Sequence, residues 1–71
     1  MDIYAKPGTI VEFIEKDVSE SQINWGGHCD PREVLVVGKK YVIDHTEVHS
    51  HHTKVFLEGH PGKSFNSVWF D

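Results

Sequence analysis

Histidine side chains are concentrated in one short stretch of this chain, and their spacing is the first feature suited to chemistry. The 71-residue sequence contains six histidines, and four of them lie within residues 45–52. A continuous strand would place His45, Glu47, His49 and His51 on one face, because side chains two apart point the same way. Imidazole and carboxylate groups in this arrangement bind Zn²⁺ or another divalent ion. A turn expected after residue 49 would break that face, so ordinary hydrogen-bonding histidines remain the alternative to a metal site.

The same region also carries groups suited to binding an anion. Backbone amides in a glycine-containing turn form an anion-binding concavity, and a nearby lysine adds positive charge. An aromatic ring beside them would stack on a base, which predicts a pocket for a small anionic ligand of nucleotide size, held between subunits. The candidate ligand-binding residues are Trp25, Arg32, His49, His52, Lys54, Lys63, Ser64, Asn66 and Ser67. Taken singly, each lysine is equally consistent with a solvated surface charge.

Catalytic patterns are missing from the sequence. Cys29 follows His28, but adjacent residues on an irregular loop rarely face one another as a nucleophile and its base must. No G-x-S-x-G, Walker-type or H-E-x-x-H pattern is present. We therefore expect a protein that is not an enzyme and has no cofactor, with zinc as the one alternative.

Length, charge and cysteine content limit the class of protein. A chain of 71 residues forms one small domain, whose core is marginal without a disulfide, a metal or self-association. The single cysteine excludes an internal disulfide and fits a reducing cytoplasm. The formal net charge of −4 argues against general nucleic-acid binding. No apolar run approaches the roughly 20 residues that span a bilayer, so we expect no membrane association.

Short β-strands are expected to position these side chains. Strands are predicted over residues 9–14, 33–37, 41–48, 53–58 and 65–70. Residues 1–8 form a lead-in and residues 15–32 a long loop, and no segment has the length and period of a helix of ten or more residues. Five antiparallel strands with a long first loop and tight later turns predict an all-β fold, a small barrel of the SH3-like type.

One face of each strand is expected to fill the barrel. The predicted interior residues are Ile10, Leu35, Val37, Val42, Val48, Val55, Leu57, Val68 and Phe70, with Val11 or Phe13 in addition. This assignment leaves Tyr41, Phe56, Phe65 and Trp69 outside or at the rim. Such an aromatic surface exceeds what a small monomer exposes. We therefore expect a homo-oligomer, with Phe56, Phe65 and Trp69 as candidate interface residues.

Three motifs in the C-terminal half carry a resemblance. They are GKKYV at Gly38–Val42, VHSHHTKV at Val48–Val55 and PGKSFNSVWFD at Pro61–Asp71. They resemble a G-K-x-Y-x-V opening, a V-H-S-x-H-T-K-V hairpin and a P-G-K-x-F-N-S-V-x-F-[DE] strand in short uncharacterised proteins of bacteriophages and prophages. The resemblance covers roughly half of the chain. It implies an SH3-like fold and the cytoplasm of an infected or lysogenic bacterium, and it assigns no catalytic residue.

Two classes of function follow from these observations. The first is a phage-encoded binding protein with an anti-defence role, which sequesters a nucleotide-type signal or a host defence component. The second is a structural or adaptor module that docks on a host protein through the exposed aromatic face. A metal-binding domain built on His45, His49 and His51 is a further alternative.

Overall fold

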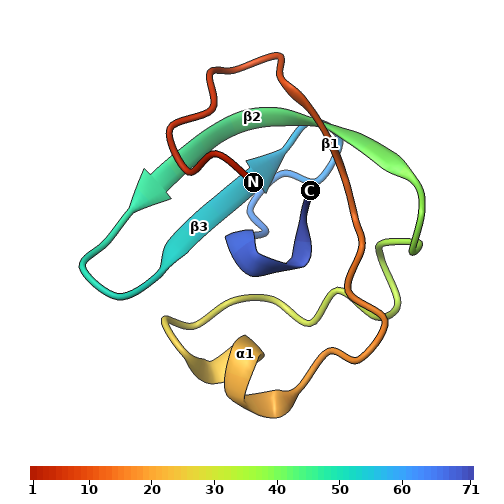
Figure 1. Cartoon of the computed structure of the whole chain (residues 1–71), viewed down its shortest axis with the longest axis vertical. Coiled ribbons are helices and arrows are strands. Elements are labelled where there is room, and N and C mark those ends of the chain that lie inside the picture. Colours follow the sequence, from red (N-terminus) through yellow and green to blue (C-terminus); the bar gives the residue numbers. More distant parts are fainter.

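The computed structural model describes residues 1–71, and an antiparallel sheet is its main element (Figure 1). The strands β1 (Ile10–Glu12), β2 (Lys40–Val48), β3 (Thr53–Leu57) and β4 (Phe65–Asn66) form one four-stranded sheet in chain order. The remaining elements are a helix, α1 (Glu20–Asn24), and a 3-10 helix, η1 (Ser67–Trp69). The prediction of a small all-β protein is confirmed at this level. Neither helix has the length and apolar character needed to cross a membrane.

The last residues of the chain pair with the end of β1 and the residue after it. Phe13, just after β1, forms a β-bridge with Phe70. Glu12 and Asp71 exchange two backbone hydrogen bonds of 3.2 and 2.9 Å. β1 therefore has a backbone partner on each side, β2 on one and the last residues of the chain on the other. The N-terminal amine donates to the carbonyl of Phe70 at 3.1 Å, and the two termini lie together in Figure 1.

The core draws on the strands, on the loop before β2 and on the C-terminal segment. Its ten buried apolar residues are Val11, Phe13, Leu35, Tyr41, Ile43, Val55, Leu57, Phe65, Trp69 and Phe70. The predicted interior positions Leu35, Val55, Leu57 and Phe70 are confirmed. Val11 and Phe13 are both buried, because residues two apart share a face of the strand.

Other predicted interior residues lie outside the core. In β2 the side chains of Tyr41 and Ile43 are buried, so the prediction that Val42 and Val48 fill the interior is wrong: Val42 is half-buried and Val48 exposed. Three adjacent apolar residues allow either phase of the strand, and a shift of one residue exchanges the two faces. The predictions for Ile10, Val37 and Val68 are wrong as well, since these three side chains are exposed.

The C-terminal segment differs most from expectation. The predicted strand over residues 65–70 is a two-residue strand followed by η1. The Asn66 side chain accepts a hydrogen bond from the Val68 amide at 3.1 Å, and such local bonds compete with a β-ladder. The tighter turn buries Phe65 and Trp69 completely, at 0 % exposed. The prediction that these two residues form an exposed interface is therefore wrong, and Phe56 alone of the three remains half-exposed.

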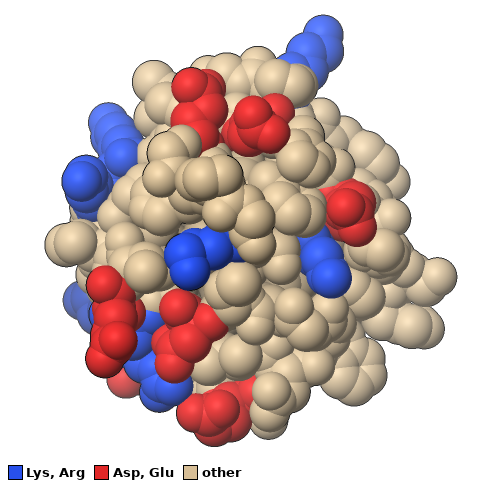
Figure 2. All heavy atoms as spheres, turned by 180° about the vertical axis from the view of Figure 1, so that it is seen from behind, with Lys and Arg blue, Asp and Glu red and all other residues tan.

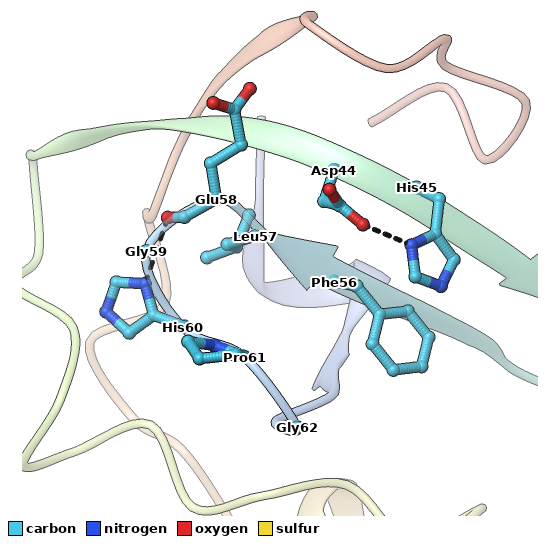
Figure 3. Close-up of a pocket in the computed structure, with 9 residues that line it drawn as sticks. All are labelled: Asp44, His45, Phe56, Leu57, Glu58, Gly59, His60, Pro61 and Gly62. Carbon is cyan, nitrogen blue, oxygen red and sulfur yellow. Dashed lines mark hydrogen bonds and ion pairs between the residues drawn. The ribbon is translucent and has the colours of Figure 1, made fainter.

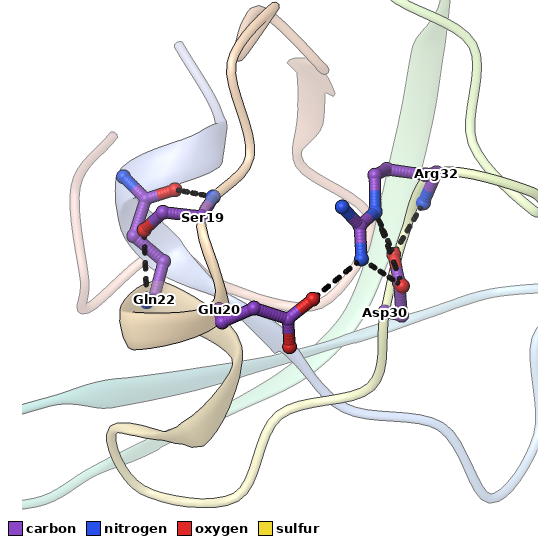
Figure 4. A network of polar contacts seen from close by, with 5 residues as sticks. All are labelled: Ser19, Glu20, Gln22, Asp30 and Arg32. Atoms are coloured by element: carbon purple, nitrogen blue, oxygen red, sulfur yellow. Dashed lines mark hydrogen bonds and ion pairs between the residues drawn. The ribbon is translucent and has the colours of Figure 1, made fainter.

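The long connection between β1 and β2 is turned rather than extended. The predicted strand over residues 33–37 is wrong: Val34 and Leu35 both donate their amides to the carbonyl of Pro31, at 3.1 and 2.8 Å. Upstream, a capping box starts α1, in which the Ser19 hydroxyl accepts from the Gln22 amide at 3.2 Å and the Gln22 side chain accepts from Ser19 at 3.1 Å (Figure 4). This helix has five residues, which agrees with the expectation of no helix of ten or more.

Candidate functional site

A hollow of about 350 Å³ lies where the long loop, the β2–β3 hairpin and η1 meet. We call it the histidine pocket. It is lined by Ile3, Trp25, His49, Ser50, His51, His52, Thr53, Asn66, Ser67 and Val68. Five of the predicted ligand-binding residues, Trp25, His49, His52, Asn66 and Ser67, are thus brought together at one place. The chain joins them from segments that are distant in sequence.

Trp25 forms an aromatic wall of this pocket. Its backbone amide closes α1 by donating to Ser21 at 2.9 Å. Its indole Nε1–H donates to the carbonyl of His51 at 3.0 Å, which ties the loop to the hairpin. The side chain nevertheless remains 60 % exposed. A fixed and exposed indole is a suitable platform for stacking a planar ring.

Two stacked imidazoles form a second wall. The rings of His49 and His52 lie 4.5 Å apart and are inclined by 14°. His49 Nε2 lies 3.0 Å from a carboxylate oxygen of Glu47, which orients its ring. His52 lies directly over Gly26, where an added Cβ would come within 2.4 Å of its Cδ2 atom. Only glycine therefore allows the loop to approach this ring so closely.

His28 lies behind the stack and is buried, at 6 % exposed. Its ring makes edge contacts with His52 at 5.6 Å and with Trp69 at 6.0 Å between centroids. Neither ring nitrogen has a hydrogen-bond partner in the chain, and such buried polar atoms are uncommon in proteins. Sequence reasoning missed this role, because His28 is far in sequence from the hairpin and no spacing pattern joins them.

Burial and neighbouring positive charge favour the neutral forms of His28 and His52. Burial is the largest cause that lowers the pKa of His28 to about 4, and His52, Lys54 and His49 lower it further. The carbonyl of Trp25 acts in the opposite direction, although it makes no hydrogen bond to the ring.

The pKa of His52 is also lowered, first by desolvation and then by the histidines and lysine around it, against an opposing effect of Glu47. These shifts favour the neutral forms of His28 and His52, and a neutral imidazole has one hydrogen-bond donor and one acceptor. Lys54, half-buried on β3, supplies positive potential without lining the hollow.

Asn66 uses its side-chain polar atoms to fix the shape of the pocket rather than to contact a ligand. Its side-chain nitrogen donates to the carbonyl of Gln22 at 3.0 Å, and its oxygen accepts from the Val68 amide at 3.1 Å. The side chain of Gln22 in turn accepts from the indole of Trp69 at 3.0 Å. These bonds attach α1 to η1 and fix the floor of the hollow.

Three predicted ligand-binding residues lie elsewhere. Figure 4 shows the guanidinium of Arg32 between Asp30 and Glu20, with contacts of 2.6 and 3.0 Å. These carboxylates raise the pKa of Arg32, and the same hydrogen bonds lower that of Asp30 to about 2. Lys63 lines a separate hollow beside Arg32, and the buried Ser64 uses its carbonyl to accept from a loop amide. None of the three reaches the histidine pocket.

A larger hollow, of about 510 Å³, lies beside β2, the end of β3 and the turn that follows β3 (Figure 3). Its residues include Asp44, His45, Phe56 and the turn from Glu58 to Gly62. The ring of His45 stacks on Phe56 at 4.2 Å, and its Nδ1 lies 2.6 Å from Asp44. Despite its size, this hollow contains none of the predicted ligand-binding residues and no polar side chain buried without a partner. We therefore regard the histidine pocket as the better candidate.

The histidines predicted as metal ligands are not gathered at one point. His45 is paired with Asp44, whereas His49 is paired with Glu47. The carbonyl of His51 accepts from Trp25, and its side chain is exposed. No group of three histidine, cysteine or acidic side chains is placed to hold a metal ion.

Charged side chains do not form one broad basic surface on the face that Figure 2 shows. Acidic and basic residues alternate there, and the chain as a whole carries a formal net charge of −4.

Comparison with known proteins gives no match, either to a family model or to a curated protein or solved structure. The function must therefore be argued from the chemistry of the site.

Proposed function

We propose that the protein is a non-enzymatic binding protein that captures a nucleotide-type ligand in the histidine pocket. The observation that carries this proposal is the convergence of Trp25, His49 and His52 on one hollow from separate segments. Its volume of about 350 Å³ falls within the roughly 300–1,000 Å³ of small-molecule sites. An exposed aromatic face beside hydrogen-bonding imidazoles matches a base better than it matches a purely apolar ligand.

Each wall of the pocket has a role in this proposal. The base stacks on the indole of Trp25, which its bond to His51 holds in place. The rings of His49 and His52 exchange hydrogen bonds with polar atoms of the ligand. Lys54 adds favourable potential for a phosphate. Cys29 does not line the hollow, and we assign no catalytic group, so the ligand is held and released unchanged.

The proposal extends to the fold and the biological setting. We infer an SH3-like barrel in which the residues around Phe70 act as a fifth strand; its support is the Phe13–Phe70 bridge and the position of η1 before that strand. The motifs at Val48–Val55 and Pro61–Asp71 support a phage origin. Sequestration of a nucleotide signal or a host defence component in the cytoplasm of the bacterial host is then the function that we propose.

Calorimetry against a panel of linear and cyclic mononucleotides and dinucleotides tests the proposal. We expect stoichiometric binding of at least one compound, which is recovered intact after the protein is denatured. Trp25→Ala should weaken binding by roughly 5- to 150-fold, because stacking of a base contributes about 1–3 kcal/mol. Arg32→Ala is the matched control and should leave the affinity unchanged, since Arg32 lies outside the pocket. Absence of heat with every compound would contradict the proposal.

An adaptor function is the second candidate, with different docking residues from those first predicted. Phe65 and Trp69 are buried, but the exposed Trp25 and Val68 border a further hollow of about 370 Å³ beside α1. A partner protein bound there would be lost with Ser21→Arg, because Ser21 borders this hollow and does not line the histidine pocket. Pull-down from host lysate with this variant as control tests the adaptor: a captured protein that the variant loses favours it, whereas nucleotide binding without a captured protein favours the nucleotide trap.

A further inference from the structure

Imidazole rings connect residues 25–28 of the long loop to the β2–β3 hairpin. His28 packs its ring edge against His52 with 5.6 Å between centroids. His52 also covers Gly26, and the indole of Trp25 donates to His51 at 3.0 Å. Residues 25–28 thus contact the hairpin through one hydrogen bond and the packing of imidazole rings, while Leu35 and the bond from the Val36 amide to the Tyr41 hydroxyl attach a later part of the connection.

The carbonyl of Trp25 is the one neighbour that favours a proton on His28, and it makes no hydrogen bond to the ring. The hairpin presents His49 and His52 to it, β3 presents Lys54, and η1 presents the apolar face of Trp69. All the titratable groups among these neighbours become or remain positive on acidification.

The one carboxylate in the cluster is Glu47, and its oxygen already lies 3.0 Å from His49. His52 faces the same carboxylate, together with His51, His49 and Lys54. A proton on the buried ring of His28 would thus be both desolvated and surrounded by like charge.

We propose that His28 is an acid-sensitive latch on the histidine pocket: when its ring binds a proton, residues 25–28 separate from the β2–β3 hairpin and the pocket opens. The sheet itself stays folded, because Cys29 and the strands keep their backbone hydrogen bonds. This regulation goes beyond ligand capture and does not depend on which ligand the pocket takes.

The direction and size of the effect follow from proton linkage. The pKa of His28 is about 4 in the closed form and returns to the ordinary value of 6.5 when the ring reaches water. The closed form is therefore fully favoured above pH 6.5 and loses its advantage as the pH falls toward 4. Relative to high pH, proton uptake shifts the equilibrium toward the open form by about 30-fold at pH 5 and on the order of 150-fold at pH 4.

Nuclear magnetic resonance of the free protein tests the latch from pH 7.5 to pH 4. The indole proton of Trp25, assigned with Trp25→Phe, reports the bond to His51. We expect its signal to shift and to exchange with water with a midpoint between pH 6.5 and 4, in step with the ring protons of His28. The backbone amides of β2 and β3 should keep their dispersion over this range.

Two variants make the test specific. His28→Phe should remove the change at Trp25, whereas His45→Gln, an exposed histidine on the other hollow, should leave it intact. An unchanged indole signal down to pH 4 would overturn the latch, as would loss of β2–β3 dispersion at the same midpoint, which would indicate global unfolding. If His28→Phe does not fold, different midpoints for His28 and Trp25 in the wild type also overturn it. None of these readouts uses a nucleotide, so failure of the proposed function would be seen separately.

Discussion

Replacing Gly26 by alanine should displace His52 from the pocket, and the neighbouring Gly27 provides a matched control. Both glycines have positive φ, at +91° and +76°. A Cβ on Gly26 would lie 2.4 Å from Cδ2 and 2.6 Å from Cγ and Nε2 of His52. A Cβ on Gly27 would have no atom within 4 Å. The two substitutions therefore share the backbone cost and differ only in the contact with the ring.

The difference between the two variants measures that contact. Positive φ costs an L-residue about 1–2 kcal/mol at either position. Gly26→Ala adds an overpacking cost of about 1–3 kcal/mol, because the ring must give up its contacts with His49 and His28. We expect Gly27→Ala to lower the free energy of unfolding by about 1–2 kcal/mol and Gly26→Ala by roughly 2–5 kcal/mol. In a domain of this size, each kcal/mol lowers Tm by about 4–8 °C.

Urea unfolding of the wild type, both single variants and Gly26→Ala combined with His52→Ala provides the assay. In the His52→Ala background the clash is absent, so Gly26→Ala should cost no more than Gly27→Ala does in the wild type. Equal unfolding free energies for the two single variants, within about 0.5 kcal/mol, would refute the close approach of His52 to the loop. Loss of nucleotide binding in Gly26→Ala alone would connect this contact to function.

Three further predictions test burial, acid response and assembly. Acid should lower the free energy of unfolding through His28, whose pKa is near 4 in the folded protein. The contribution of His28 is complete above pH 6.5, and about 3 kcal/mol of it is lost by pH 4. Urea unfolding of His28→Phe should lack this dependence on pH. Trp69→Ala should cost about 3–5 kcal/mol and unfold much of the protein at 37 °C by circular dichroism, which an interface residue would not do. Val36→Lys should lower the mass measured by sedimentation if the homo-oligomer forms through the exposed aliphatic side chains; an unchanged mass rejects that surface.

The strand pattern of the sequence predicted that a sheet forms, but it predicted less well which face of each strand is buried. β3 contains three adjacent apolar residues, but the charged Lys54 and Glu58 lie on the face of Phe56, so period two assigns Thr53, Val55 and Leu57 to the buried face. In β2, the run Tyr41–Ile43 is apolar on both faces, so alternation alone does not decide which side is buried. The packing of the whole sheet decides it, and that information is not local.

Local signals that were present in the sequence explain two of the other differences. Ser19 with Gln22 three residues later is a capping box, and it starts a helix within the predicted loop. Asn66 followed by serine is typical of a side-chain-to-backbone turn, and it ends β4 after two residues. The joining of His28 to His52 has no such signal, because it depends on how the loop folds back over Gly26.

The structure also changes which residues support the expected homo-oligomer. A homo-oligomer was predicted because aromatic side chains of the C-terminal segment were expected to be exposed. Instead Phe65 and Trp69 are buried, and the side chain of Gln22 accepts from the Trp69 indole. Self-association remains a prediction that now rests on Ile10 and Val36, which are 63 % and 61 % exposed.

A histidine at position 28, packed against Trp69, is unfavourable if only stability is considered. An imidazole with two unpaired buried nitrogens costs about 1–3 kcal/mol for each unsatisfied group, and a phenyl ring at position 28 would fill similar space without that cost. His28→Phe should therefore unfold no more easily than the wild type at pH 7. A variant that is more stable and yet keeps its pocket shut in acid would show that the histidine serves opening rather than packing.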